Sequence, residues 1–129
     1  MEKRRSIDVA GARHVNPIPS ASRRGPFVVS GAISGADPAT GKVPEDLETQ
    51  CAAMFANVKR VIETAGGTTD DIVKMTVWIT DRALRPIMNK YWVEMFPDPA
   101  SRPARHTIAS GDFIPPMQIQ CDLMAMIDD

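Results

Sequence analysis

The chain has 129 residues, of which 43% are hydrophobic and 24% are charged, and its formal net charge is −1. These values are ordinary for a globular protein, and the length predicts one domain over residues 1–129. A nearly neutral chain lacks the basic balance that is typical of nucleic-acid-binding proteins, so a nucleic-acid partner is not expected.

The cysteines and the apolar runs narrow the class of protein further. Cys51 and Cys121 are far apart in the sequence, and no Cys-x-x-Cys or His-rich spacing indicates a metal site. No apolar run follows Met1, and no stretch approaches the length that crosses a membrane, so we expect neither a signal peptide nor a membrane partner. The sequence is consistent with a reducing cytoplasm.

The N-terminal third of the sequence predicts an arm, two turns and short strands. Residues 1–13 are polar and predict an N-terminal arm, and the prolines of residues 16–19 favour an extended loop. Residues 23–26 predict a turn, and residues 27–30 predict a short apolar strand that ends at Gly31. The run at 37–42, with its Asp, Pro and Gly, predicts a second turn.

A first helix is predicted from Glu45 and Asp46 to the pair Gly66 and Gly67. Its apolar residues recur at helical spacing: Leu47, Cys51, Met54, Phe55, Val58, Val61, Ile62 and Ala65. Acidic residues at the start suit the helix dipole, and glycine ends the helix. We therefore expect an amphipathic helix that buries Cys51 as an ordinary core residue.

The second half predicts a strand, a helix and two more strands. Residues 72–80 are rich in β-branched side chains, and alternation places Val73, Met75, Val77 and Ile79 on one face. Asp81 is predicted to cap a second helix, whose apolar stripe is Leu84, Ile87, Met88, Tyr91, Trp92 and Met95. After a proline-rich loop, residues 105–110 and 117–127 predict two strands, the last with strict alternation.

The predicted order is strand, strand, helix, strand, helix, strand, strand. We expect an α+β domain in which two helices cover one face of a mixed sheet. The opposite face would then expose Trp78, Met124 and Met126, and such surface is usually covered by another subunit. The pattern therefore predicts a homo-oligomer.

Several short runs, in order and at matching spacing, resemble one known family. They are Ser-Gly-Ala-Ile at 30–33, Asp-Pro-Ala-Thr-Gly at 37–41, Asn89, and Pro-Ala-Arg at 103–105 followed by the last strand. The chain is identified on these runs, over roughly residues 14–127, as a member of the Rid/YjgF family, the RidA-like imine and enamine deaminases. The resemblance implies a chorismate-mutase-like fold, a homotrimer, and ligand sites in clefts between adjacent subunits.

The resemblance also implies a reaction. The family hydrolyses reactive 2-imino or 2-enamino acids to 2-keto acids and ammonia, without a metal or an organic cofactor. It implies catalytic roles for Arg105, which would bind the substrate carboxylate, and for Gln120, which stands where the deaminases have Glu. Arginine presents a planar fork of donors that fits a carboxylate. A glutamine can orient water, but it cannot accept a proton as a glutamate does.

Further substrate-binding positions are implied at Ile18, Ser30, Gly31, Asn89 and Thr107. Ile18 stands where many of the deaminases have Tyr, and the hydroxyl of Thr107 stands where they often have Ser or Cys. Structural explanations remain open for several of these residues. Gly31 could serve a strand end with an unusual φ, and Asn89 could be an ordinary helix residue.

A structural explanation also remains open for Arg105, which could form a salt bridge with Asp122 or Glu94 of some subunit. The leading interpretation is a RidA-like hydrolytic deaminase that acts on a small carboxylate-bearing ligand, with a non-standard substrate because of Gln120. The alternative is a non-enzymatic protein that binds or senses a keto acid. Ribonuclease activity is the third interpretation, and the weakly acidic charge argues against it.

Overall fold

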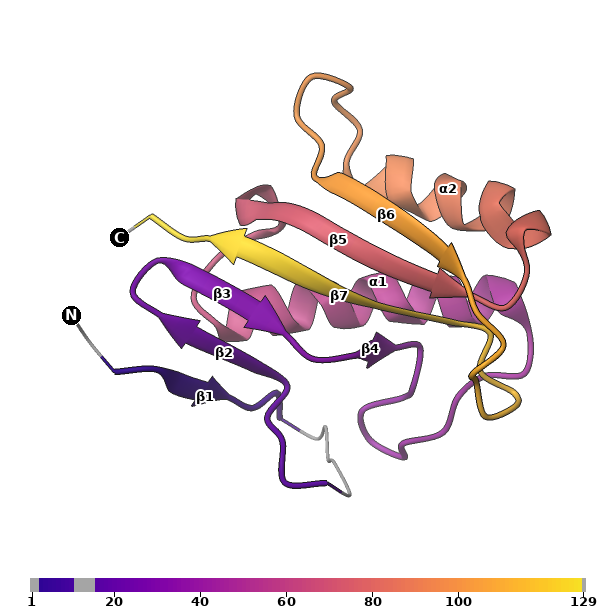
Figure 1. Ribbon diagram of the computed structural model, residues 1–129, viewed down its shortest axis with the longest axis horizontal. Helices are drawn as coiled ribbons and strands as arrows, with labels where there is room; N and C mark the ends of the chain where they lie inside the picture. The colour runs from indigo at the N-terminus through magenta and orange to yellow at the C-terminus, as the bar shows by residue number, and fades with distance from the viewer. Residues whose placement is uncertain (1–2, 11–15, 129) are drawn as a thin grey trace.

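A sheet and a layer of helices make up the computed structural model, which describes residues 3–10 and 16–128 (Figure 1). The strands are β1 (Arg5–Ile7), β2 (Ala21–Arg24), β3 (Phe27–Ser30), β4 (Ile33–Ser34), β5 (Ile72–Ile79), β6 (Ala104–Ala109) and β7 (Ile119–Met126). The helices are α1 (Leu47–Thr64) and α2 (Arg85–Met95), and short 3₁₀ turns span Thr69–Asp71 and Arg82–Leu84.

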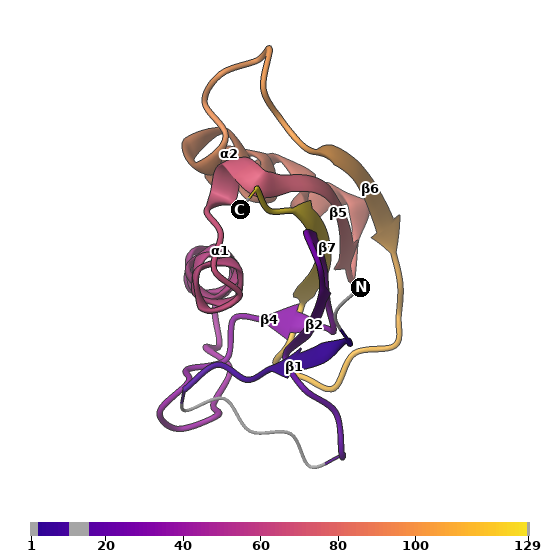
Figure 2. The same ribbon diagram turned by 90° about the vertical axis from the view of Figure 1, so that its left-hand side faces the viewer.

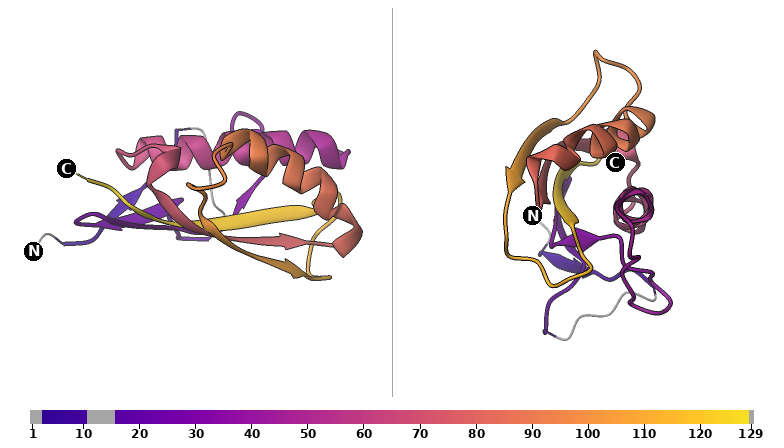
Figure 3. Two further views of the ribbon diagram at one scale, coloured as in Figure 1. Left: turned by 90° about the horizontal axis from the view of Figure 1, so that it is seen from above. Right: turned by 90° about the vertical axis from the view of Figure 1, so that its right-hand side faces the viewer.

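The strands pair in the order β1-β2-β3-β7-β5-β6, and β4 pairs with the beginning of β7. β5 and β6 run parallel and are joined through α2, whereas the other pairs are antiparallel. Both helices lie on one side of the sheet (Figure 3, left), and the sheet curves toward α1 (Figure 2). The predicted α+β class, with a mixed sheet and two helices on one face, is confirmed.

Helix α1 follows the predicted pattern at both ends. The carboxylate of Asp46 accepts a hydrogen bond from the backbone N–H of Thr49 at 3.0 Å, which satisfies a free donor at the helix start. Gly66 has a φ of +101°, which a side chain rarely adopts, so the chain can turn away there. The predicted stripe, including Cys51, is buried against the sheet.

The last strand also alternates as predicted, but β5 departs from the prediction at its beginning. The residues of β7 that face the helices are buried, from Ile119 to Ala125. In β5, Ile72 pairs with Ala125 and Lys74 pairs with the neighbouring Met124, so Val73 is an extra residue in a β-bulge. Val73 is 51% exposed whereas Met75 is buried, so its predicted place on the same face as Met75 was wrong, because the bulge shifts the alternation.

Strand β3 lies where residues 27–30 predicted a strand, but β1 and β2 were not predicted. β1 lies in the polar segment that predicted only an arm, and residues 1–2 and 11–13 of that arm lie outside the described residues. Strand β2 contains Arg23 and Arg24, so the predicted turn shortens to Gly25 and Pro26. Arg23 is buried because it donates to the carbonyls of Gly25 at 2.8 Å and Ala65 at 2.7 Å. Backbone pairing, rather than apolar alternation, holds these strands.

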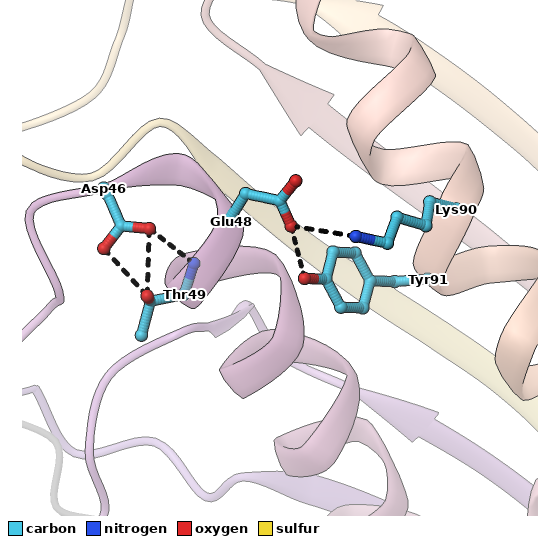
Figure 4. A network of polar contacts seen from close by, with 5 residues as sticks. All are labelled: Asp46, Glu48, Thr49, Lys90 and Tyr91. Carbon is cyan, nitrogen blue, oxygen red and sulfur yellow. Dashed lines mark hydrogen bonds and ion pairs between the residues drawn. The ribbon is translucent and has the colours of Figure 1, made fainter.

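The second helix begins later than predicted, and an exposed network ties it to the first helix. Asp81 caps the 3₁₀ turn by accepting from Ala83, and α2 starts only after Leu84. Tyr91 donates its hydroxyl to Glu48, and Lys90 lies 3.5 Å from the same carboxylate (Figure 4). The bond to Glu48 raises the pKa of Tyr91 to about 12.

Gln50 joins four segments of the chain in the core. Its Nε2 donates to the carbonyls of Pro44 and Pro116, each at 2.7 Å, and its Oε1 accepts from the N–H of Gln118 at 2.8 Å. The loop after β4 passes so close that a Cβ added to Gly35 would lie 2.4 Å from the Gln50 carbonyl oxygen. One residue of α1 therefore fixes both the loop after β4 and the beginning of β7.

Replacing Gln50 with leucine should destabilise the fold. The Gln50→Leu variant leaves two carbonyls and one N–H without their partner in a buried region, which costs about 3 kcal/mol of unfolding free energy. Urea denaturation followed by circular dichroism measures the loss. The matched control is Gln118→Leu, whose side chain makes no hydrogen bond with the described residues and should change stability by less than about 0.5 kcal/mol. Equal stability of the two variants would contradict the role of Gln50.

Candidate functional site

Arg105 lies in the edge strand β6 and points toward helix α2. It pairs with the buried Met75 of β5, so its side chain is on the helix side of the sheet. Its Nη1 donates to the sulfur of Met88 at 3.1 Å, and its Cζ lies 4.9 Å from the centre of the Trp92 ring. The guanidinium is thus positioned by a thioether and an aromatic face, neither of which carries a compensating charge.

No carboxylate of the described residues forms an ion pair with Arg105. The alternative of a salt bridge with Asp122 fails within one chain, because Asp122 pairs with Thr76 and lies on the opposite face of the sheet. Burial lowers the pKa of Arg105, and the charge of Arg85 lowers it further. An arginine remains protonated at neutral pH in any case. The surroundings therefore disfavour this cation and would favour an anion beside it.

Gln120 lies on the other face of the sheet from Arg105. In β7 it pairs with Trp78 of β5 and with Ser34 of β4, between the buried residues Ile119 and Cys121. Trp78 pairs in turn with Ile108 of β6, so the residue of β6 in register with Gln120 is three residues beyond Arg105 and two strands away. A small ligand cannot contact both side chains within one chain, because the sheet lies between them.

A cavity of about 350 Å³ lies beside Gln120, between β4, α1 and the loop that follows β4. Ile18, Ser34, Asn57 and Arg60 contribute to its lining, together with Gln120. Asn57 donates to the carbonyls of Ser34 at 2.8 Å and Ala36 at 2.9 Å, and it accepts from Arg60. These hydrogen bonds hold the cavity wall on the α1 side, and Ile18 adds an apolar side chain to the lining.

Ser30 and Gly31 lie at the end of β3, next to this cavity. The Ser30 hydroxyl donates to the Gly31 carbonyl at 2.8 Å and accepts from the Leu123 N–H at 2.9 Å, so the fold itself uses it. The Gly31 N–H donates to the Ser20 carbonyl at 3.0 Å. Gly31 does not have a positive φ, and an added Cβ would meet no atom closer than 3.8 Å. The explanation of Gly31 by an unusual φ was therefore wrong.

Asn89 and Thr107 lie on the same side of the sheet as Arg105. Thr107 follows Arg105 by two residues in β6 and shares its face, and Asn89 follows Met88 in α2. Both are half-buried, and neither side chain makes a hydrogen bond with the described residues. The residues singled out from the sequence thus form two groups. We call Arg105, Asn89 and Thr107 the Arg105 group, and Ile18, Ser30, Gly31 and Gln120 the Gln120 group.

Arg85 was missed by the sequence reading, which treated the second helix as an apolar stripe. It is the first residue of α2 and lies one turn before Met88, which contacts Arg105. The sequence did show that Arg85 lies three residues before Met88 of the apolar stripe. That spacing indicates a functional position only when the contact between Met88 and Arg105 is known.

The described residues hold no cluster of three His, Cys, Asp or Glu side chains that could bind a metal ion. Cys51 and Cys121 are free thiols and are buried. Burial, with a contribution from Glu48, raises the pKa of Cys51 to about 11, and burial raises the pKa of Cys121 still further. No helix in the described part of the chain has the length and hydrophobicity needed to cross a membrane.

Comparison with known proteins places this α+β fold in a family. The family model described as Endoribonuclease L-PSP matches residues 15–127. A RutC family protein of Aquifex aeolicus is 32% identical over 98 residues, which are 76% of this chain and 78% of the relative. TdcF of Escherichia coli, which carries the name of a reactive intermediate deaminase, is 29% identical over 90 residues, or 69% of this chain and 70% of TdcF.

Solved structures agree with this placement. RidA from an Antarctic Psychrobacter superposes with a TM-score of 0.88 at 26% identity, covering 95% of this chain and 99% of the other. The YjgF gene product of Escherichia coli superposes with a TM-score of 0.85 at 25% identity, covering 95% and 98%. The chain therefore has the same α+β fold as these two solved structures. The chain belongs to the Rid/YjgF family, whose family model bears the description Endoribonuclease L-PSP.

The two thiols should be unreactive in the folded protein. A buried thiol whose pKa is raised stays protonated at pH 8, and the thiolate is the reactive form. We expect a thiol-specific disulfide reagent to label neither Cys51 nor Cys121 in the native protein, and to label both in urea. Labelling of Cys51 or Cys121 in the native protein at the rate of free glutathione would contradict this prediction and would make that thiol a candidate nucleophile.

Proposed function

We propose that the chain is a hydrolytic deaminase that converts reactive 2-imino or 2-enamino acids to 2-keto acids and ammonia. The observation that carries the proposal is the Arg105 guanidinium, which is held against Met88 and Trp92 and has no ion pair among the described residues. A fixed, uncompensated fork of this kind suits a carboxylate. Family membership and the name of the relative TdcF support the same reaction class.

The chemistry asks little of the protein beyond positioning. Arg105 would bind the carboxylate, and water would add to the electrophilic C=N carbon to give a carbinolamine. The C–N bond then breaks, and ammonia leaves with the proton that the hydroxyl loses as the keto group forms. Gln120 would orient the water through its amide, but it cannot accept a proton, and general-base help is typically worth about 10² to 10⁴ in rate. We therefore propose a non-standard or unusually labile substrate.

A homotrimer would unite the two residue groups. Because Arg105 and Gln120 lie on opposite faces of one sheet, a ligand that contacts both would have to lie between chains. The sheet face away from the helices also exposes Phe27, Met124 and Met126 by 44% to 47%, and neighbouring exposed apolar residues of this kind often mark a protein–protein interface. In such an assembly, a shared ligand would lie where the Arg105 group of one subunit meets Gln120 of the next.

A second function is favoured by one specific residue. A pocket that only binds a keto acid needs hydrogen bonds but no base, and Gln120 meets that need. In that case the protein would sense or carry a small carboxylate without turnover.

Ribonuclease activity has less support, because the net charge is −1 and neutralisation of phosphates dominates affinity for RNA. Two free cysteines are consistent with a place in the reducing cytoplasm.

The deaminase proposal is tested with 2-iminopropionate and 2-iminobutyrate generated in situ. Native protein should speed ammonia release above the buffer rate, and Arg105→Ala should lower kcat/KM at least about a hundredfold, because a charge-assisted bidentate contact is lost. Gln120→Glu should raise the rate about 10²-fold by supplying a base. The exposed Arg82, changed to Ala, is the matched control and should leave the rate unchanged.

The same assay separates the two functions. Activity that appears only in Gln120→Glu would favour the binding function for the native protein. Activity unchanged in Arg105→Ala would reject both functions, since both depend on this cation for the carboxylate.

The oligomeric proposal predicts a sedimentation-equilibrium mass of three times the 14.1 kDa chain. Met124→Glu places a charge on the open sheet face and should shift the mass toward the monomer. Val93→Glu, at a similarly exposed position on the outer side of α2, is the control and should leave the trimer intact. A native monomer, or a trimer that survives Met124→Glu and dissociates with Val93→Glu, would contradict the proposed surface.

A further inference from the structure

Arg85 has an unusual environment for a cation at the surface of a helix. It is the first residue of α2 and is half-buried. Its Nε is buried and makes no hydrogen bond with any described residue. A buried donor without a partner costs about 1 to 3 kcal/mol, so a retained example calls for a physical reason.

The spacing along α2 brings Arg85 to the group that holds Arg105. Arg85, Met88 and Trp92 follow one another at i, i+3 and i+7, which places them on one face of the helix. That face receives the Arg105 guanidinium, which contacts Met88 and Trp92. The charge of Arg85 is felt by Arg105, whose pKa it helps to lower. Two guanidinium groups therefore face the same region from α2 and from β6.

Two carboxylates next to α2 have other partners. Asp81, just before α2, accepts from the N–H of Ala83 at 2.9 Å. Glu48, which reaches α2 from α1, binds Tyr91 and Lys90. No ion pair joins Arg85 or Arg105 to a carboxylate of the described residues. A water molecule could satisfy the Arg85 Nε, but it would not offset the repulsion between two cations.

We propose that Arg85 binds a second acidic group of the substrate, so that the site prefers 2-imino or 2-enamino dicarboxylates over monocarboxylates. The inference rests on the proposed function, because Arg105 must bind the first carboxylate. A ligand with two negative groups would neutralise both guanidinium groups and give the buried Nε its acceptor. Arg85 then determines specificity, while Arg105 determines binding as such.

Binding of stable keto acids tests the proposal without turnover. Isothermal titration calorimetry measures the Kd of the native protein for 2-oxoglutarate, a dicarboxylate, and for 2-oxobutyrate, a monocarboxylate. The native protein should bind 2-oxoglutarate at least tenfold more tightly. Arg85→Gln should remove that preference by weakening 2-oxoglutarate alone, and Arg85→Lys, which keeps the charge, should retain part of it. Arg82→Gln, which removes an exposed arginine one turn earlier, should keep the native preference.

The outcomes separate this inference from the proposed function. Equal affinity for the two ligands in the native protein, or an undiminished preference in both Arg85 variants, would overturn the role of Arg85 while leaving Arg105 in place. If the Arg105→Gln variant binds neither ligand, the result would support one site that takes both ligands. Unchanged binding of both ligands in Arg105→Gln would instead reject the proposed function on which the inference rests. A variant that fails to fold is identified by its thermal unfolding curve, and Arg85→Lys then decides the question.

Discussion

The buried amide of Gln50 is the interaction on which the arrangement of the site depends. Its three hydrogen bonds reach the segment before α1, the loop that ends at Pro116 and the beginning of β7. Gly35 packs against the backbone of the same residue. These contacts set where β4 meets β7, and hence the position of Gln120 and the wall of the cavity beside it. A buried amide suits this task because its donors and acceptor have fixed directions, whereas apolar packing would tolerate small shifts.

The fold places the two residues proposed to be catalytic on opposite faces of the sheet. Arg105 lies on the helix side of the sheet, and Gln120 lies on the open side, so one small ligand cannot contact both within one chain. Under the proposed function, such a division would make activity depend on assembly, because one ligand could meet both residues only where chains come together. The exposed apolar residues of the open face supply a reason for assembly, since burying them releases ordered water.

The cations near α2 are the basis for the proposed selection of a carboxylate. Met88 and Trp92 orient Arg105 but leave its charge free, and Arg85 increases the local positive potential. Partial burial strengthens the attraction for an anion, because the effective dielectric is lower than in water. Buried thiols with raised pKa values leave nucleophilic chemistry without a candidate at either cysteine.

The sequence by itself determined the local structure wherever apolar spacing was clear. The α1 stripe, its Asp46 cap and the alternation of β7 were predicted correctly, because periodic burial leaves a direct signal in residue order. The tertiary structure alone decided the features that depend on partners distant in sequence. Strands β1 and β2 exist through backbone pairing, Val73 is displaced by a bulge, and the relation between Arg85 and Arg105 requires α2 to pack on β6. Such contacts join side chains whose sequence spacing carries no periodic signal, so only the folded chain reveals them.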